Sequence, residues 1–404
     1  MNFIVQKFGG TSLNSESKRK QARKNIIEEV QKDNCPVVVV SAMGREGQAY
    51  ATDTLLELVE NGETFIPERQ KDLLLSCGEI ISSVVMASEL EKIDYQARSL
   101  TGWQAGITTD ESFGSSRIIE VNPKRIIELW EKEIIPVVAG FQGISPQGEI
   151  TTLGRGGSDT TASVLAYALE AERIDIYSDV KGFMTSDPKK CSEAKKLEKI
   201  TYNEACELAY QGAKVVHPRA AEVAMDGEIP LNIRSVNSNG NNKGTTIDSK
   251  QVNIKSDKPA TGIATRNDII FIEIYPDNGK NYATGLKVFS LLAEEGISVD
   301  FINIRPEKAS FVINNELTER AINIIEKDDF EFNVSSDYCK ISVVGGGMTG
   351  QPGVMARIVE ALCEAGIEIY QTTDSHTTIS CLIAEEKEKK AVKALHNAFN
   401  LEEH

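Results

Sequence analysis

Short apolar runs alternate with longer amphipathic stretches over residues 1 to about 248. The runs 3–8, 36–41 and 134–140 are rich in aromatic or β-branched residues and lead into small residues, as buried strands of a parallel sheet do. Segment 68–91 has the length and pattern of a helix, and 175–179 is a further candidate strand end. This alternation predicts an α/β fold in which helices cover a mostly parallel sheet.

The C-terminal part of the chain contains an internal repeat. Residues 283–313 align without a gap on residues 353–383, and segment 269–275 falls on 339–345. Each copy has the order strand, loop, helix, strand, short connection, strand, which is typical of ferredoxin-like modules. Chance similarity between amphipathic segments is the alternative. The identical pairs are Leu292 and Leu362, Glu294 and Glu364, Gly296-Ile297 and Gly366-Ile367, Ser310 and Ser380, and Ile313 and Ile383.

Segment 237–258 is rich in Asn, Gly, Ser and Lys, which marks a linker. We therefore expect an α/β domain over residues 1–248, a linker and first ferredoxin-like module over 249–335, and a second module over 336–404.

Charge and composition exclude some classes of partner. The 404 residues carry a net charge of −16 at a pI near 4.9, so the field of the protein repels nucleic acid and anionic membranes. The N-terminus enters a strand pattern without a signal segment, and no apolar run approaches the roughly 18 residues of a membrane span. A small anionic substrate remains compatible if basic groups gather in one cleft.

The seven cysteines are odd in number and form no C-x-x-C pair, so we expect reduced thiols in a cytoplasmic protein. The four histidines are scattered, and we expect no His/Cys metal site.

A first glycine turn follows the strand pattern of residues 3–8. Lys7 precedes Gly9 and Gly10, and two hydroxyl residues follow. Glycine lets a backbone approach an anion, and a nearby ammonium supplies the compensating charge. Because the Walker spacing is absent, this is not the common P-loop. An ordinary strand-to-helix turn is the alternative interpretation.

A second glycine cluster covers residues 152–159 and leads into a helical pattern. A helix start behind three glycines favours an anion, and Arg155 can present a bidentate fork to a carboxylate. Asp159 could bind a substrate ammonium or a shared Mg²⁺, or it could merely cap the helix, as could Ser158.

Other polar residues follow strands or interrupt apolar stretches. Glu79 ends the apolar stretch 73–79, where it could pair with an α-amino group or simply face solvent. Ser41, Thr52 and the pair Ser178-Asp179 supply further polar groups. Taken singly, Lys214 and His217 are expected to be structural.

Together and in this order, these segments resemble the aspartate kinases of the amino-acid-kinase superfamily. The matching motifs are Lys-Phe-Gly-Gly-Thr-Ser (7–12), Ser-Ala-Met-Gly (41–44), Cys-Gly-Glu (77–79), Gly-Arg-Gly-Gly-Ser-Asp (154–159), Ser-Asp-Val-x-Gly (178–182) and Gly-Ala-Lys-Val-Val-His-Pro (212–218). The resemblance implies a three-layer amino-acid-kinase fold followed by two ACT modules. It implies phosphoryl transfer from ATP, with Mg²⁺, to the β-carboxylate of L-aspartate, the entry to lysine, diaminopimelate, threonine and methionine synthesis.

The resemblance also assigns roles by position. Lys7 and Asp159 would be catalytic. Aspartate would contact Thr52, Glu79, Arg155, Gly156, Gly157 and Ser158. ATP would contact Lys7, Phe8, Gly9, Gly10, Ser41, Ser178, Asp179, Met184, Lys189, Lys214 and Val215. Many relatives carry tyrosine at the position of Met184 and arginine at that of Lys189.

Regulation by an end product is implied as well. The ACT modules would pair across a homodimer and bind diaminopimelate, lysine or threonine, the sequence 371–379 being most like the diaminopimelate-sensitive type. The strand at about 259–265 would complete the sheet of the second module. Candidate effector contacts are Ser298, Asp300, Gln371, Thr373, Asp374 and Ser375. Another carboxylate kinase of the superfamily, or a non-catalytic amino-acid sensor, are the alternatives.

Overall fold

The structure is a computed structural model that describes residues 1–60, 66–237, 244–249, 259–275, 282–327, 331–348 and 351–403. Most of the predicted linker 237–258 lies outside these residues. The chain divides into two compact units. The first comprises Met1–Phe183, Lys196–Ala209 and Lys214–Lys255, and the second comprises Met184–Lys195, Tyr210–Ala213 and Ser256–His404. Two short segments of the predicted first domain thus belong to the second unit, and the domain boundaries at 248 and 335 stay predictions.

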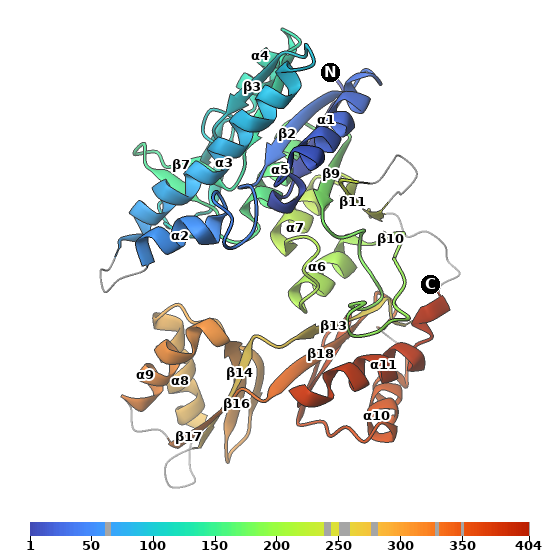
Figure 1. The fold of residues 1–404 in the computed structure, drawn as a ribbon. Helices are drawn as coiled ribbons and strands as arrows, with labels where there is room; N and C mark the ends of the chain where they lie inside the picture. Colours follow the sequence, from blue (N-terminus) through green and yellow to red (C-terminus); the bar gives the residue numbers. More distant parts are fainter. Residues whose placement is uncertain are drawn as a thin grey trace. The chain divides into compact units, whose positions relative to one another are not determined.

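An eight-stranded sheet forms the centre of the first unit (Figure 1). Six consecutive strands of this sheet run parallel, and the next strand along the sheet is antiparallel to them. The apolar runs seen in the sequence are its central strands, whose side chains are almost all buried. In sheet order the strands are β10 (Lys199–Ile200), β12 (Thr245–Ile247), β11 (Leu231–Ser235), β9 (Arg173–Ser178), β1 (Phe3–Phe8), β2 (Cys35–Val40), β6 (Ile135–Ala139) and β3 (Ala97–Leu100).

Register aligns the carboxyl ends of the central strands. Phe8 of β1 pairs with Val40 of β2 and with Tyr177 of β9, and Val40 pairs with Ala139 of β6. The turns after these four strands therefore emerge at one edge of the sheet, which is where ligands bind in parallel α/β sheets.

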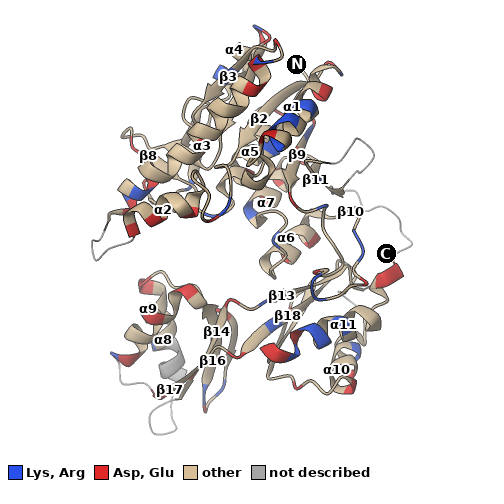
Figure 2. Ribbon diagram, viewed as in Figure 1, with Lys and Arg blue, Asp and Glu red and all other residues tan. Residues whose placement is uncertain are grey.

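Helices cover both faces of this sheet (Figure 1). On one face α1 and α3 bury apolar side chains against β1, β2 and β6, and on the other α5 packs on β1 and β9 and against α7. Figure 2 shows that the strands are mostly free of charged residues, which lie on helices and loops. The helices are α1 (Glu16–Val30), α2 (Thr52–Glu60), α3 (Glu68–Glu91), α4 (Lys124–Trp130), α5 (Gly157–Ala168), α6 (Tyr202–Tyr210) and α7 (Pro218–Asp226).

A small mixed sheet completes the first unit and leads into the second glycine cluster. Its strands lie in the order β5 (Ile118–Val121), β4 (Ile107–Thr109), β7 (Gln142–Ile144) and β8 (Ile150–Thr152). Helix α3 contacts β8 as well as β3 and β6, so it spans both sheets.

Helix α3 bears on the expectation that no segment is long and apolar enough to span a membrane. Among the described residues it alone is long and apolar enough to cross a membrane, although no unbroken apolar run reaches that length. Half of its apolar window is buried inside the protein, as in the core helix of a globular domain. It also carries the buried acids Asp72, Glu79 and Glu89.

The second unit contains two ferredoxin-like modules, as the repeat predicts. The first has the sheet order β15 (Asp300–Ile304), β16 (Ala309–Asn314), β14 (Ile269–Tyr275) and β17 (Glu331–Ser335), with helices α8 (Tyr282–Glu294) and α9 (Thr318–Glu326). The second has the order β13 (Gly262–Arg266), β18 (Tyr338–Val344), β20 (Thr378–Ala384) and β19 (Gln371–Asp374), with helices α10 (Val354–Glu364) and α11 (Glu388–Ala398). Strand β13 precedes the first module but pairs with β18 of the second, as the resemblance implies.

Candidate active site

A cavity of about 520 Å³ lies at the carboxyl edge of the large sheet, within the size range of small-molecule sites. A larger hollow of about 920 Å³ runs along α1 and contains none of the motif residues. The first cavity gathers the predicted catalytic pair, every predicted aspartate contact and two predicted ATP contacts, of which Lys7 is also a member of the catalytic pair. They are Lys7, Ser41, Thr52, Glu79, Arg155, Gly156, Gly157, Ser158 and Asp159.

Lys7 and Asp159 form an ion pair in this cavity. The Lys7 Nζ lies 2.6 Å from Asp159 Oδ1, and both side chains are nearly buried. Lys7 is the next-to-last residue of β1, and Asp159 lies in the first turn of α5. Asp159 Oδ2 also accepts a hydrogen bond from the His217 N–H at 3.3 Å. Asp159 thus holds the lysine ammonium in the cavity, and the helix-cap interpretation is wrong.

Gly156 is the residue that caps α5. Its φ of 67° is left-handed, and an added Cβ would lie 2.2 Å from the Cγ of His217. Only glycine combines this conformation with so close a ring. Burial lowers the pKa of His217, and the Asp159 charge opposes that shift, so the imidazole next to the glycine turn is neutral at pH 7.

Glu79 is buried in α3 with its carboxylate toward the cavity. Its Oε1 accepts a hydrogen bond from the Ala42 N–H at 2.9 Å, whereas Oε2 is buried and has no hydrogen-bond partner among the described residues. Burial raises the pKa of Glu79 to about 8, although the Ala42 hydrogen bond and the Lys7 charge lower it. A ligand ammonium would satisfy Oε2 and supply the missing charge. The solvent-facing alternative for Glu79 is wrong.

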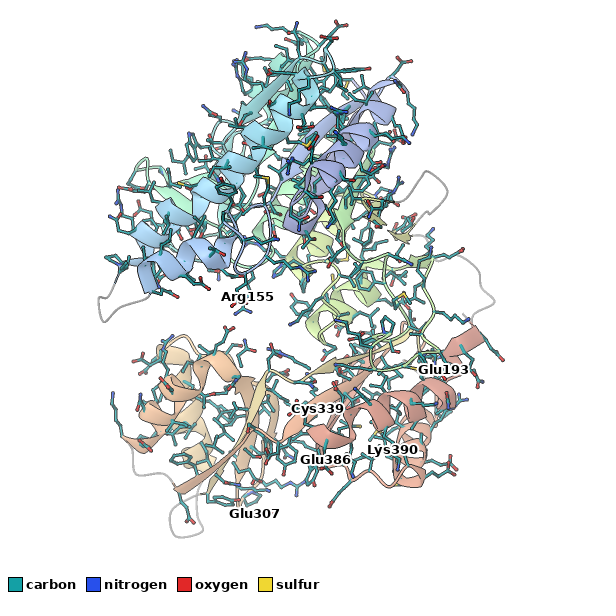
Figure 3. The ribbon with its side chains drawn as sticks, in the orientation of Figure 1. Arg155, Glu193, Glu307, Cys339, Glu386 and Lys390 are labelled. Atoms are coloured by element: carbon teal, nitrogen blue, oxygen red, sulfur yellow. The ribbon has the colours of Figure 1, made fainter. Side chains whose placement is uncertain are left out.

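Four more of the predicted site residues line the cavity from different elements. Arg155 lies on the loop between β8 and α5 (Figure 3), and Thr52 begins α2. Ser158 packs so closely on Gly140 that an added Cβ there would lie 2.9 Å from the serine Cβ. Ser41 follows β2 and donates its N–H to the Phe8 carbonyl at 3.1 Å. The strand ends therefore fix the relative positions of these groups.

The first glycine turn is held by the protein itself. The Gly9 N–H, which we expected to donate to a phosphate oxygen, donates instead to the Tyr177 carbonyl oxygen at 3.0 Å. The Phe8 side chain is fully buried and stacks on Tyr177 at 4.7 Å between ring centroids. At Gly10 an added Cβ would lie 2.2 Å from the Ala42 carbonyl oxygen. Close packing of two turns thus accounts for Gly10 without a ligand.

Several lining residues escaped the sequence analysis, and Asp72 and Phe141 are two of them. Asp72 is fully buried in α3 and faces the cavity two turns before Glu79. Phe141 follows β6 with a left-handed φ of 71°, uncommon for a bulky residue, and an added Cβ on Gly157 would lie 2.8 Å from its ring. The signal for Phe141 was its position after a strand ending in Ala139-Gly140. Asp72 gave no such signal.

Comparisons with known proteins identify relatives of this chain. The sequence profile of the Amino acid kinase family matches residues 2–235, and that of the ACT domain matches residues 333–397. Aspartokinase 1 of Bacillus subtilis is 45% identical over 405 residues, covering 99% of this chain and 100% of the relative. The aspartokinase of Geobacillus stearothermophilus is 43% identical over 414 residues, covering 100% and 98%.

The chain belongs to the aspartokinases, within the amino acid kinase family. Solved structures of aspartokinases share its fold. The Clostridium acetobutylicum aspartate kinase has a TM-score of 0.76 at 26% identity, covering 98% of this chain and 100% of that one. Escherichia coli aspartokinase III, in complex with aspartate and ADP, has a TM-score of 0.80 at 24% identity, covering 98% and 99%.

The residues expected to bind the nucleotide of this aspartokinase are distributed over both units. Ser178 ends β9 and accepts a hydrogen bond from the Val180 N–H at 3.1 Å, and Asp179 forms an exposed ion pair with Arg45. Lys214 is exposed and Val215 is half-buried in the first unit. Their contacts with ATP stay predictions. So do those of two residues in the second unit, Met184 and Lys189.

Two expected effector residues lie where the modules of this aspartokinase meet. The Asp300 carboxylate pairs with the buried Lys340 ammonium at 2.7 Å. Burial raises the pKa of Asp300, but the hydrogen bond and charge of Lys340 outweigh it and lower that pKa overall. Gln371 accepts a hydrogen bond from Ser310 at 2.9 Å and donates one to the Phe301 carbonyl. Asp300 and Gln371 therefore connect β15 and β16 to β18 and β19.

The other expected effector residues are exposed. Ser298 lies before β15, and Thr373 and Asp374 end β19. Ser375 forms the turn that follows, because its hydroxyl accepts a hydrogen bond from the Thr378 N–H at 3.1 Å. Binding of an effector by these residues stays a prediction.

Proposed function

We propose that the cavity transfers the γ-phosphoryl group of ATP to the β-carboxylate of L-aspartate, giving 4-phospho-L-aspartate. The observation that carries the proposal is the meeting of Lys7, Asp159, Arg155 and Glu79 in one cavity. Two cations and a buried acid with an unpaired oxygen suit a ligand that carries carboxylates and an ammonium. Arg155 takes the α-carboxylate, and Glu79 takes the α-amino group.

The reaction needs no general base from the protein. The β-carboxylate of aspartate has a solution pKa of about 3.9, so it is already ionised at neutral pH. The site must instead bring two anions together and neutralise the negative charge on the phosphoryl group while it is transferred. Lys7, held by Asp159, supplies that charge from the end of β1. Mg²⁺ bound with ATP would neutralise further phosphate charge.

A turnover assay tests this function directly. With ATP and Mg²⁺, a carboxylate that accepts the phosphoryl group becomes an acyl phosphate. Added hydroxylamine then attacks the acyl phosphate, releasing phosphate and forming an acyl hydroxamate, so hydroxamate forms only from an acceptor that the protein phosphorylates. We expect hydroxamate with L-aspartate and far less with L-glutamate or N-acetyl-L-glutamate. Equal rates with the longer acceptors would indicate another carboxylate kinase, and no ATP turnover with any acceptor would favour an amino-acid sensor.

The selectivity for aspartate follows from the same cavity. One methylene changes binding by only about 1–3 kcal/mol in an apolar pocket, so size alone discriminates poorly. With the α-carboxylate fixed at Arg155, the distance to Lys7 determines how far the reacting carboxylate reaches. Glutamate then places its side-chain carboxylate out of register for in-line attack.

We further propose that an end-product amino acid binds where the two ACT modules meet. The Asp300–Lys340 pair and Gln371 give this junction charged and polar groups that an amino acid recognises. Lysine, threonine and meso-diaminopimelate are the candidates. The effector is the one that both raises the melting temperature and inhibits turnover. If none of the three amino acids raises the melting temperature or inhibits turnover, the proposal that an effector binds at this junction is wrong.

A homodimer through the ACT modules is the expected assembly. Strand β15 is an edge strand, and its alternate residues Ile302 and Ile304 are 51% and 49% exposed. An exposed apolar edge favours pairing with another chain. We expect light scattering to give the mass of two chains, and the double change Ile302→Lys and Ile304→Lys to give one. A wild-type monomer would contradict this assembly.

We also infer a cytoplasmic location. All seven cysteines are free thiols, including Cys339 and Cys381 in the buried core of the second module. Free thiols are typical of a reducing compartment.

A further inference from the structure

Asp72 is a buried acid whose partners are unusual. Its side chain is fully buried in α3, and both carboxylate oxygens accept hydrogen bonds from neutral donors. The Gly114 N–H lies 3.0 Å from Oδ1 and 3.1 Å from Oδ2. The Thr152 N–H lies 2.8 Å from Oδ2, and the Thr152 hydroxyl lies 2.7 Å from Oδ1. No ion pair with Asp72 occurs among the described residues.

A carboxylate is well suited to hold this set of donors. Burial without a paired cation raises the pKa of Asp72, and the hydrogen bonds from Thr152 and Gly114 partly offset that rise. An ionised carboxylate offers about four acceptor sites on two oxygens, whereas an amide side chain offers one oxygen. An apolar side chain would leave two buried backbone N–H groups without acceptors.

The two clamped segments form one wall of the active site. Thr152 ends β8, and the chain continues directly through Leu153 and Gly154 to Arg155. Gly114 lies against this turn, because an added Cβ on Gly154 would lie 3.2 Å from its carbonyl oxygen. The Ser116 N–H also donates to the Thr152 carbonyl at 2.8 Å. Asp72 therefore fastens the loop before β5 to the base of the turn that carries Arg155.

Helix α3 connects this wall to Glu79. Asp72 and Glu79 are seven residues apart, which places them on the same face of the helix two turns from one another. Both line the cavity, as do Gly114, Thr152 and Arg155. One helix thus fixes Glu79, the proposed partner of the substrate ammonium, and through Asp72 the turn of Arg155, the proposed partner of its α-carboxylate.

We infer that Asp72 is a positioning residue for aspartate binding, which sets the Arg155 turn at a fixed distance from Glu79. The inference rests on the proposed function. Both Asp72 oxygens are taken up by donors of Gly114 and Thr152, so in this proposal Asp72 acts through these two residues. Misplacement of a binding group by about 1 Å can lower activity a hundredfold. We therefore expect loss of this clamp to raise the KM for aspartate far more than the KM for ATP.

The decisive variant is Asp72→Ala, measured in the full-length protein by steady-state kinetics. We expect the KM for aspartate to rise at least about tenfold and the KM for ATP to stay within about twofold. Asp72→Asn is the conservative variant. Its oxygen can keep the two N–H donors near Oδ2 while the Thr152 hydroxyl rotates to accept from the amide, so its aspartate KM falls between wild type and Asp72→Ala.

Asp110→Asn is the matched control. Asp110 is a half-buried residue of the same loop whose carboxylate accepts hydrogen bonds from the Ser112 N–H at 3.2 Å and the Arg117 N–H at 2.9 Å, and it does not line the cavity. Its aspartate KM stays at the wild-type value. If Asp72→Ala fails to fold, Thr152→Val removes only the hydroxyl donor, and its aspartate KM must still rise while the ATP KM does not.

A purely structural role predicts another result. It lowers the melting temperature and the fraction of active protein but leaves both KM values unchanged, and that outcome overturns the inference, as does an equal rise of both KM values. Failure of the proposed function looks different, because the wild-type protein itself would then show no turnover that depends on aspartate.

Discussion

The Lys7 Nζ lies 2.6 Å from the Asp159 Oδ1, and this ion pair connects the end of β1 to the first turn of α5. Such a pair at the surface would contribute little, but here both side chains are nearly buried and face the cavity. Asp159 is itself held by the His217 N–H. The arrangement fixes an ammonium group in the cavity where we propose that the phosphoryl group is transferred.

Removal of that cation should abolish most of the catalysis. We expect Lys7→Ala to lower kcat at least about a hundredfold, the scale of losing one preorganised charge contact. The melting temperature should change much less than the rate, since the ion pair lies at the rim of the core. Lys20→Ala, which breaks an exposed ion pair with Glu16 on α1, is the control with unchanged kinetics. Near-normal turnover of Lys7→Ala would remove Lys7 from catalysis.

Gly156 should be intolerant of any side chain. Gly156→Ala places a Cβ 2.2 Å from the His217 ring and also forces alanine into a left-handed conformation, which alone costs about 1–2 kcal/mol. We expect a lower melting temperature and at least about a tenfold loss of kcat/KM for aspartate, because His217 also holds Asp159. Gly148→Ala is the matched control: its φ is likewise left-handed, at 87°, but nothing lies within 4 Å.

Gly148→Ala should show only the backbone strain, as a small loss in melting temperature with kinetics within about twofold of wild type. If both variants behaved alike, the packing of His217 against the turn would have no part in the activity.

The sequence predicts the strand ends and the two glycine turns because local patterns encode them. An apolar run that stops at Gly9, or a helix pattern that starts behind Gly157, is visible within ten residues. Asp72 is not predictable in this way, since its donors lie 42 and 80 residues away in the chain. The cap of α5 is not predictable for another reason: Ser158 and Asp159 are good capping residues, but the helix is capped by the left-handed Gly156 before them.

Glu79 should make aspartate binding depend on pH. Its pKa is about 8 in the free protein, so at pH 7 the carboxyl group is mostly protonated. In the proposed function the substrate ammonium pairs with the carboxylate form of Glu79, so we expect binding below pH 8 to release a proton. We therefore expect the aspartate KM to fall as pH rises toward about 8, by at most tenfold per pH unit, and to level off above it.

The variant Glu79→Gln removes the titrating group. Its aspartate KM should be high and nearly independent of pH from about 6 to 8, whereas the KM for ATP should follow the wild-type profile. The same slope in both proteins would show that another group titrates and that Glu79 does not bind the ammonium.

Arg155 should govern the affinity for aspartate and not that for ATP. Hydrogen bonds to charged groups contribute about 1.5–3 kcal/mol, so Arg155→Ala should raise the aspartate KM roughly ten- to a hundredfold. Arg155→Lys keeps the charge but loses the planar fork, and its KM should lie between the two. Arg69→Ala is the control, because Arg69 also lies in the first unit but pairs with Glu149 at 2.6 Å outside the cavity lining. Equal rises in the KM values of aspartate and ATP would place Arg155 at the phosphates instead. The distance from Arg155 to Lys7 would then not explain the selectivity for aspartate.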